Sequence, residues 1–365
     1  MVQSLTGGGA ERVAALWCTG FVERGYEVGI TLDCSSKTSI TYKIPSSVKM
    51  FNIYGITFIR RITDIICPQI RNFFLIRKIK RVIFDFHPDV IIGVMQPWAE
   101  WAKIATNGMA VKIINTEHNS FERPNCAPMS KETWIKKYVW NKHYNHVTVL
   151  NNVDKICAQD YLDNVTVLPN PLAFVPCKDL SDKKKIILAA GRFEDWHYKG
   201  FDILIKVWKE VAPIFRDWNL EIVGKGKKKD FNIVKKMIVD AGVEHRVTIL
   251  GYQANMLPIY QRASVFMLTS RYEGFGMVLI EAMSQGCAPI ACDYKGRQRE
   301  IITNKEEGIL CEPEDIYSLT KALIKMISDD MYRKKIQINA IKRSNFYKLD
   351  NIIDRWEEIF KKIGL

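Results

Sequence analysis

Two glutamates, Glu273 and Glu281, lie eight residues apart in the segment TSRYEGFGMVLIEAMSQG, on either side of a Gly-Phe-Gly turn. Apart from the two glycines, the residues between them are apolar. Carboxylates that meet only solvent fit such a segment poorly, because a charge among apolar side chains needs a polar partner. The pair therefore indicates a site where carboxylates meet a polar ligand.

Two cations in the segment AAGRFEDWHYKGFDILI suit an anionic ligand. Arg192 follows a predicted strand, and Lys199 precedes Gly200 and a predicted helix. Together they could neutralise a diphosphate, the arginine through its planar fork of donors and the lysine as a compact charge. Either residue alone is more often a solvated surface group.

Two further candidates lie in the first half of the chain. Gly7, Gly8 and Gly9 precede a helix predicted to begin near Ala10. Glycines let backbone amides approach a ligand closely, and a helix amino terminus favours anions. His118 ends a predicted strand in the segment NTEHNSF. Each is weak evidence by itself, since many such turns bind nothing and an isolated histidine is more often structural.

The elements that must position these residues alternate along the chain, with strands rich in valine and isoleucine separated by longer amphipathic stretches. This pattern is typical of parallel α/β architecture, in which ligands bind at the carboxyl ends of the strands. The predicted strands are 88–95, 111–118, 146–151, 184–193, 220–226, 246–252, 263–270 and 287–293.

A composition change at Leu168–Lys185, with three prolines and then a lysine run, predicts a boundary in a chain of 365 residues, which is long for one core. We expect two Rossmann-like domains that face each other across a cleft. The expected parts are an N-terminal domain (1–172), a linker (173–185), a C-terminal domain (186–345) and a C-terminal helix (346–365) that packs back toward the N-terminal domain.

The composition of the whole chain limits which cellular compartment and which kinds of binding partner are expected. Nine scattered cysteines, never in a Cys-x-x-Cys pair, argue for reduced thiols rather than disulfides or a zinc site. Neither a signal sequence nor a run of apolar residues long enough to span a membrane is present, so we expect a cytoplasmic protein. The net charge of +13 indicates an anionic partner, which the charge alone does not identify.

The stretch Phe58–Phe84 concentrates part of this charge, with seven arginines and lysines against the single Asp64. Isoleucines and phenylalanines lie between the cations at helical spacing. The stretch therefore reads equally well as a basic helix at an anionic membrane surface or as a core helix with a solvated basic face.

The combination of motifs is more specific than its parts. The segments GGGAERV, EHN, LPNP, GRFEDWHYKGFD, IVGKG, ILGY, EGFGMVLIEAM and GILCEPED occur in this order along nearly the entire chain. At these separations they resemble the retaining nucleotide-sugar glycosyltransferases of family four, which have the two-Rossmann GT-B fold. The resemblance is strongest from Ile186 to Asp315, and the paired glutamates are its most discriminating element.

The resemblance implies that the N-terminal domain (1–172) binds the acceptor and the C-terminal domain (186–345) binds the nucleotide sugar, and it implies a role for each candidate. Glu273 would lie beside the donor sugar, Glu281 would bind the ribose hydroxyls, and His118 would contact the sugar near its 6-hydroxyl. Arg192, Lys199 and loop amides would stabilise the departing diphosphate, and no Asp-x-Asp motif is present, which suits a reaction without a metal. The implied catalytic residues are Glu273, His118, Arg192 and Lys199; the implied donor-binding residues are Gly8, Gly9, Arg192, Lys199, Gly274, Phe275, Gly276, Val278, Leu279 and Glu281.

The substrates are expected from similar enzymes of bacterial surface-polysaccharide assembly, which share the pattern of Gly296 and Glu300–Ile302. We expect a UDP-hexose or UDP-N-acetylhexosamine donor, with GDP-mannose second, and no cofactor. The expected acceptor is a polyprenyl-diphosphate-linked saccharide, which the protein would meet as a peripheral enzyme on the inner face of the cell membrane. Retention could proceed by same-face attack or by double displacement through Glu273.

Other readings stay open. A GT-B nucleotide-sugar epimerase is disfavoured by the two motifs around Lys199 and Glu273, and a silent sugar-binding homologue by the retained glutamates and cations. A nucleic-acid-binding protein would explain the charge, but no nucleic-acid module is recognisable. In one respect the chain departs from the family, since only Met1–Leu5 stand where a complete first strand is usual.

Overall fold

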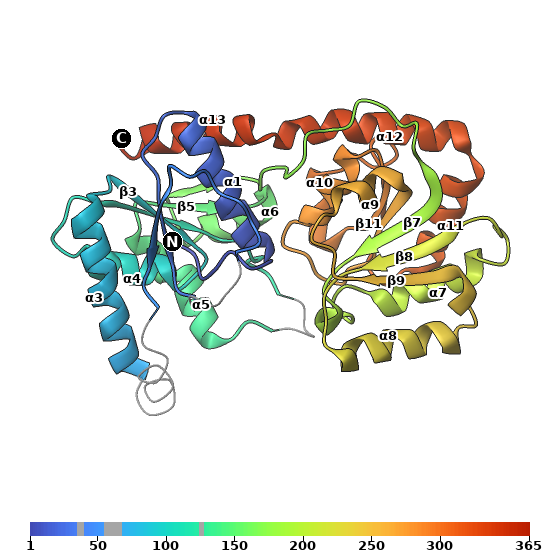
Figure 1. Ribbon diagram of the computed structural model, residues 1–365, viewed down its shortest axis with the longest axis horizontal. Coiled ribbons are helices and arrows are strands. Elements are labelled where there is room, and N and C mark those ends of the chain that lie inside the picture. The colour runs from blue at the N-terminus through green and yellow to red at the C-terminus, as the bar shows by residue number, and fades with distance from the viewer. Residues whose placement is uncertain (35–39, 55–67, 124–127) are drawn as a thin grey trace. The chain divides into compact units, whose positions relative to one another are not determined.

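The computed structural model describes residues 1–34, 40–54, 68–123 and 128–365. The chain divides into two compact units (Figure 1). Unit 1 comprises Met1–Pro171 and Leu349–Leu365, and unit 2 comprises Leu172–Lys348. In each unit parallel strands are flanked by helices, as in a Rossmann domain, so the predicted α/β class is confirmed.

The strands of unit 1 form a four-stranded sheet in the order β3-β4-β5-β6 and a two-stranded sheet of β1 and β2, all parallel. Backbone hydrogen bonds of the first residues link these sheets: Val2 N–H donates to Thr31 O (3.1 Å), and Val94 N–H donates to Met1 O (2.9 Å). Met1–Leu5 thus stand at the position of the expected first strand, with a single bridge from Val2 to Leu32. The strands are β1 (Gly29–Leu32), β2 (Lys49–Asn52), β3 (Val90–Val94), β4 (Lys112–Thr116), β5 (His146–Val149) and β6 (Val165–Val167).

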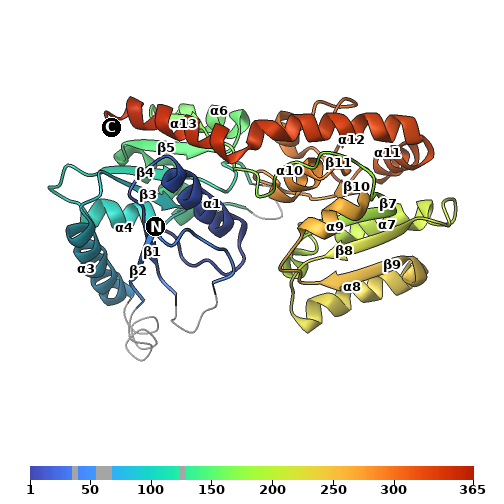
Figure 2. The same cartoon turned by 45° about the horizontal axis from the view of Figure 1, so that its top comes forward.

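The last helix of the chain belongs to unit 1, where it packs along the first helix (Figure 2). Aromatic rings join the two: Phe21 and Phe360 stack at 5.7 Å, and Trp17 meets Trp356 edge-on at 5.1 Å. Gly20 lets the helices approach, since a Cβ there would lie 2.5 Å from the Ile353 side chain. The helices of unit 1 are α1 (Gly9–Glu23), α3 (Pro68–Phe86), α4 (Trp98–Ala105), α5 (Lys131–Tyr138), α6 (Asn152–Gln159) and α13 (Leu349–Lys362).

Unit 2 is built on a six-stranded parallel sheet in the order β12-β11-β10-β7-β8-β9. Its core comes from apolar strands such as ASVFML, in which every residue of β10 is buried, and from helices packed on them. The strands are β7 (Lys184–Ala190), β8 (Asn219–Val223), β9 (Val247–Gly251), β10 (Ala263–Leu268), β11 (Ala288–Cys292) and β12 (Ile309–Cys311); the helices are α7 (Phe201–Val211), α8 (Lys228–Asp240), α9 (Leu257–Arg262), α10 (Met277–Ser284), α11 (Ile316–Ser328) and α12 (Asp330–Ser344).

The segment expected to be a linker lies against unit 2. Cys177 N–H donates to Ser284 O (2.8 Å), and Lys183 Nζ donates to the carbonyl oxygens of Tyr260, Ala263 and Gln285 at 2.6–2.9 Å. Strand β7 already begins at Lys184. These bonds hold in place the segment that leads into β7, because three carbonyl oxygens satisfy the hydrogen-bonding capacity of the Lys183 ammonium group.

Candidate active site

The carboxyl edge of the unit 2 sheet brings Lys199 and Glu273 together. Lys199 Nζ donates to Glu273 Oε1 at 2.5 Å, and Ser270 Oγ donates to the same oxygen at 2.9 Å. The Glu273 side chain is 11% exposed and that of Lys199 22%. A carboxylate this enclosed is stabilised by its two donors, so the pair forms a charged group at the strand ends.

Close backbone contacts make this arrangement possible. Gly200 has φ 65°, and a Cβ at this position would lie 2.0 Å from Thr269 O. A Cβ on Gly224, which has φ 157°, would lie 1.7 Å from Gly191 O. Only glycine permits such approaches, and they draw together the ends of β7, β8 and β10.

Arg271, which the sequence analysis missed, ties the Lys199 segment to the Glu273 segment. Its two terminal nitrogens donate to the two carboxylate oxygens of Asp202, each at 2.8 Å. Its Nε donates to Glu314 Oε1 (2.7 Å), and Nη1 also donates to His197 O (2.6 Å). The hydrogen bonds that Arg271 donates to Asp202 and Glu314 raise its pKa further above the ordinary value. The sequence did offer a signal for this ion pair, because Arg271 lies near Glu273, Asp202 lies near Lys199, and the two side chains have opposite charges.

Glu281 is buried within α10, and Tyr260 OH donates to its Oε2 at 3.0 Å. Gly276 caps the amino terminus of this helix with φ 95°, a conformation that favours glycine. Gly274, Phe275, Val278 and Leu279 lie in the same turn and first helical residues, so the whole motif forms one local structure. Tyr260, on α9, was not predicted, because nothing near it in the sequence indicates its partner.

Arg192 lies just past β7, and its guanidinium pairs with Asp195 at 2.5 Å. Its side chain is 63% exposed, in contrast to that of Lys199. Lys199 itself packs over the neighbouring Gly191, where a Cβ would lie 3.0 Å from Lys199 Cγ. The two predicted cations therefore follow the same strand end, but only Lys199 is joined to Glu273.

The glycine loop of unit 1 surrounds a carboxylate of its own chain. The amide groups of Thr6, Gly7 and Gly8 donate to Glu11 Oε2 at 2.8, 2.9 and 3.0 Å, and Ser4 Oγ donates to Glu11 Oε1. Burial raises the pKa of Glu11, but the bonds from Ser4, Gly8, Thr6 and Gly7 outweigh it and hold the pKa below its ordinary value. The Gly8 amide, expected to face a ligand, is thus bonded to Glu11, and Gly9 begins α1.

His118 lies beyond the end of β4 in unit 1, with Nε2 3.1 Å from Thr116 Oγ1. Burial lowers its pKa to about 4, so the ring is neutral near pH 7. A buried ion pair supports the segment, because Lys137 Nζ lies 3.0 Å from Glu117 Oε2 and also donates to Asn119 O at 2.7 Å. His118 and the glycine loop thus belong to unit 1, and the other candidates belong to unit 2.

No cluster of three or more His, Cys, Asp or Glu side chains that could hold a metal ion occurs among residues 1–34, 40–54, 68–123 and 128–365. Within the same ranges no helix has the length and hydrophobicity needed to cross a membrane.

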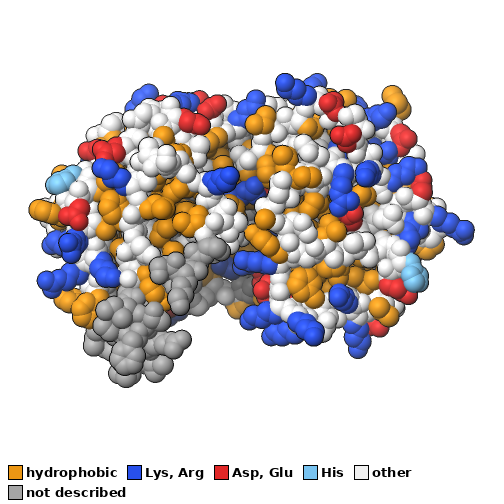
Figure 3. Space-filling view, viewed as in Figure 1, with side chains coloured by type: hydrophobic (Ala, Val, Ile, Leu, Met, Phe, Trp, Pro, Cys, Tyr) orange, Lys and Arg blue, Asp and Glu red, His pale blue; other side chains and the backbone are white. Residues whose placement is uncertain are grey.

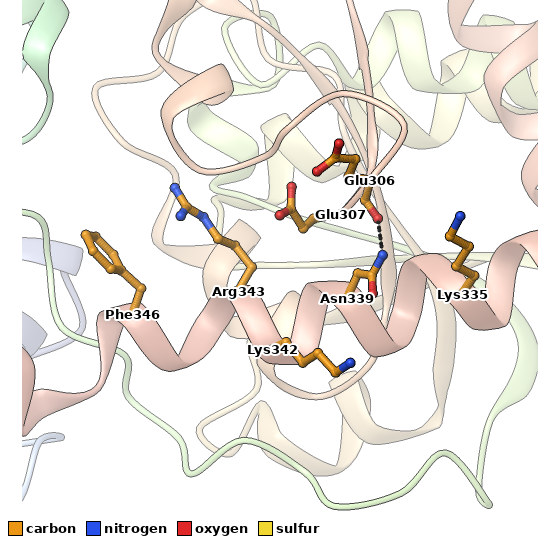
Figure 4. Close-up of a pocket in the computed structure, with 7 residues that line it drawn as sticks. All are labelled: Glu306, Glu307, Lys335, Asn339, Lys342, Arg343 and Phe346. Carbon is orange, nitrogen blue, oxygen red and sulfur yellow. Dashed lines mark hydrogen bonds between the residues drawn. The ribbon is translucent and has the colours of Figure 1, made fainter.

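A cavity of about 570 Å³ lies on unit 2 between α12 and the loop of Glu306 and Glu307 (Figure 4). Asn339 Nδ2 donates to Glu306 O across it at 3.0 Å. Charges of both signs line it, and the described residues around it include no predicted site residue. The cavity is therefore separate from the candidate active site.

The two halves of the chain match two family models. Residues 7–173 match the model described as Glycosyltransferase Family 4, and residues 176–343 match that described as Glycosyl transferases group 1. The chain is 24% identical over 356 residues to an uncharacterized glycosyltransferase of Haemophilus influenzae, covering 96% of both chains.

A second relative has an assigned activity. The chain is 22% identical over 374 residues to the Campylobacter jejuni protein named GalNAc-alpha-(1->4)-GalNAc-alpha-(1->3)-diNAcBac-PP-undecaprenol alpha-1,4-N-acetyl-D-galactosaminyltransferase, over 100% of this chain and 98% of that protein. Among solved structures, Anabaena Alr3699/HepE in complex with UDP and glucose has a TM-score of 0.80 at 18% identity, over 99% of this chain and 98% of that one. This likeness confirms the expected GT-B fold.

Proposed function

We propose that this chain, which belongs to the glycosyltransferases that join a family 4 domain to a group 1 domain, moves a hexosyl or N-acetylhexosaminyl group from a UDP-sugar to a saccharide hydroxyl. The observation that carries the proposal is the Lys199–Glu273 pair at the carboxyl edge of the unit 2 sheet. In doubly wound sheets this edge is where ligands bind. The acceptor in this proposal is a polyprenyl-diphosphate-linked saccharide of surface-polysaccharide assembly, with GDP-mannose as the alternative donor.

Lys199 stabilises the charge that develops on the leaving diphosphate as the bond to the anomeric carbon breaks. Arg192 contributes from the same strand end, and its ion pair with Asp195 opens to meet the ligand. Glu281, which Tyr260 orients, binds the ribose hydroxyls. No metal takes part in this scheme, so EDTA should leave turnover unchanged, and inactivation by EDTA with rescue by magnesium would contradict it.

Retention follows from attack on the face that the diphosphate leaves. The acceptor oxygen bonds to the anomeric carbon as the bond to the phosphate oxygen breaks, and that phosphate oxygen accepts the proton of the acceptor hydroxyl. The two donors already bonded to Glu273 Oε1 favour this route, because they lower the nucleophilicity that double displacement requires. Glu273 then orients the donor sugar and stabilises positive charge at the anomeric carbon.

Glu273→Gln tests the proposal in an assay of UDP-hexoses, UDP-N-acetylhexosamines and GDP-mannose. The change preserves the shape of the side chain but removes its charge, and turnover should fall by a factor on the order of 1,000 with the melting temperature nearly unchanged. Asp85→Asn, an exposed carboxylate on α3, serves as the matched control. Near-normal turnover by Glu273→Gln, or no turnover of any donor by the parent protein, would contradict the assignment.

Peripheral binding to the inner face of the cell membrane forms part of the same proposal. On α3 the cations Arg77, Lys80 and Arg81 are exposed, and so are three phenylalanines. Figure 3 shows hydrophobic and basic side chains beside one another over this helix. Residues 58–67 of the predicted basic stretch lie outside the described residues. The exposed phenylalanines are Phe73, Phe74 and Phe84, at 58%, 52% and 69% exposure.

Each cation near an anionic membrane contributes about 1 kcal/mol. Changing Arg77, Lys80 and Arg81 to glutamine should therefore reduce co-sedimentation with phosphatidylglycerol vesicles and leave donor hydrolysis intact. The control removes three exposed lysines of unit 2, Lys206, Lys235 and Lys236. Equal loss in both triple variants would assign the binding to net charge rather than to α3.

A further inference from the structure

Lys137, in the last turn of α5, is the one buried lysine among the residues that the structure describes, with a side chain that is 4% exposed. A cation removed from water is costly unless charged and polar partners replace the water. A buried ion pair is therefore weak evidence for stability, since an apolar side chain of similar volume avoids that cost. The partners of Lys137 show instead what its ammonium group fixes in place.

The ammonium group of Lys137 binds residues on both sides of His118. Nζ lies 3.0 Å from Glu117 Oε2 and donates to the backbone oxygen of Asn119 at 2.7 Å. It also lies 4.4 Å from the centre of the Phe121 ring, whose face attracts a cation. Residues 117–121 follow β4 and belong to no helix or strand. One side chain of α5 thus joins three residues of this segment.

The carboxylate that meets the ammonium group is itself fixed. Asn115 Nδ2 and Asn141 Nδ2 donate to Glu117 Oε1 at 2.9 and 3.2 Å. Asn141 Nδ2 also donates to Lys137 O at 2.9 Å. All four side chains are buried, so neither charge can turn to solvent. A buried network whose members bond to one another is rigid, and this one sets the position of the ammonium group from β4 and α5 together.

The His118 ring has contacts of a different kind. Its Nε2 is 3.1 Å from Thr116 Oγ1, which donates to Gly93 O at 3.1 Å. The centre of the ring is 5.8 Å from that of Trp17 on α1. These contacts orient the side chain of His118, whereas the bonds of Lys137 act on the residues before and after it.

We propose that Lys137 is a positioning residue that holds His118 where it can contact the donor sugar. The inference rests on the proposed function, with His118 as the residue expected to make that contact. Lys137 acts through His118 and does not itself meet the substrate, because its ammonium group is enclosed by the contacts above. A misplacement of roughly 1 Å can reduce turnover about 100-fold, so a small displacement of this segment should be measurable.

A double-mutant cycle tests whether Lys137 acts through His118. Lys137→Met keeps the aliphatic stem but removes the ammonium group, and kcat should fall about tenfold. In the His118→Ala background the same change should lower the residual kcat by no more than about twofold, because coupled residues are not additive. The matched control is Lys136→Met, which removes the neighbouring charge of α5, paired with Glu132 at 2.7 Å, and should resemble the parent.

Histidine-selective NMR of the protein without substrates provides a readout that a general loss of stability would not move. The His118 signal, identified by its absence from His118→Ala, is sensitive to the nearby Trp17 ring. It should shift in Lys137→Met and keep its position in Lys136→Met.

A second variant covers the case in which Lys137→Met fails to fold. Glu117→Gln combined with Lys137→Met replaces the ion pair with two uncharged side chains of similar shape. We expect the same shift of the His118 signal and the same fall in kcat, because Asn119 O still loses its donor.

The proposal is overturned if kcat in Lys137→Met equals that of the parent, if the fall is equally large in the His118→Ala background, or if the His118 signal does not move. Parental kcat in the uncharged double variant would also overturn it, since the role of Lys137 would then be to offset the charge of Glu117. Because the NMR measurement uses no donor, its result is independent of turnover. A parent that turns over no donor, but whose His118 signal shifts in Lys137→Met, would reject the proposed function and retain the placement of His118 by Lys137.

Discussion

The carboxyl edges of the parallel sheets in the two units differ in chemistry, although both units are built from parallel strands. In unit 2 the edge is charged, with the Lys199–Glu273 pair and the two-bond contact between Arg271 and Asp202. In unit 1 a cavity of about 190 Å³ lies at this edge, and the described residues that line it include two glutamines, two tryptophans and Asp33. The two edges share an architecture but differ in their side chains, so the fold alone does not decide which ligand either edge would bind.

Among these changes, removing the charge of Lys199 at the unit 2 edge should reduce kcat most. In Lys199→Met the diphosphate loses its opposite charge and Glu273 loses its partner, so kcat should fall on the order of 100-fold, about 3 kcal/mol. The fall in kcat should be smaller in Arg192→Met, because the Arg192 side chain is 63% exposed and already paired with Asp195. Lys206→Met on α7 is the control for loss of an exposed lysine. Equal kcat in Lys199→Met and in the control would remove the basis for treating this edge as the diphosphate site.

Arg271→Lys should have an intermediate effect, since a single ammonium cannot reproduce two parallel bonds to Asp202 together with those to Glu314 and His197 O. We expect about a tenfold fall in kcat with a smaller change in the affinity for UDP, because Arg271 positions the Lys199 segment and is not assigned to contact the ligand. Steady-state kinetics and calorimetry with UDP would separate the two.

Arg262 offers a matched control for Arg271. It makes the same two-bond contact with Glu221, at 2.7 and 2.6 Å, but lies at the amino end of β10. Arg262→Lys should lower the melting temperature to a similar extent and leave kcat near that of the parent. If both variants lose kcat equally, Arg271 has only a structural role.

The sequence predicted the unit 2 edge better than the unit 1 edge. Lys199 and Glu273 lie in motifs whose glycines and charges stand out locally, and the valine-rich and isoleucine-rich strands around them were predicted. Strands β1, β2, β6 and β12, which have three or four residues each, were not predicted because they give too little periodicity. Strand β5 is equally short but was predicted, because its apolar residues continue into the stretch HVTVLN.

Partners determined by tertiary contacts were also beyond prediction. Tyr260 meets Glu281 only because α9 and α10 pack together, and Gln3, Asp33 and Gln96 share a cavity although 30 and 63 residues separate them in sequence (33 − 3 and 96 − 33). The bonds from Gly7 and Gly8 to Glu11 were not predicted either, because a glycine loop ready for an anion is equally ready for a nearby glutamate.

An acid sensitivity located in unit 1 should have the smallest effect at neutral pH. His146 is buried in β5 with Nε2 2.9 Å from Thr166 Oγ1, and burial lowers its pKa to about 4, with a smaller effect from Lys362. Below pH 6.5 the unfolded chain binds a proton that the folded chain does not bind until about pH 4, so stability falls as pH drops through this window. His146→Gln should reduce the loss by about 1–3 kcal/mol between pH 7 and 4, measured by urea unfolding at each pH. His245→Gln, whose side chain is 90% exposed, should show the same pH dependence as the parent, and an equally steep loss in His146→Gln would show that other groups cause the acid sensitivity.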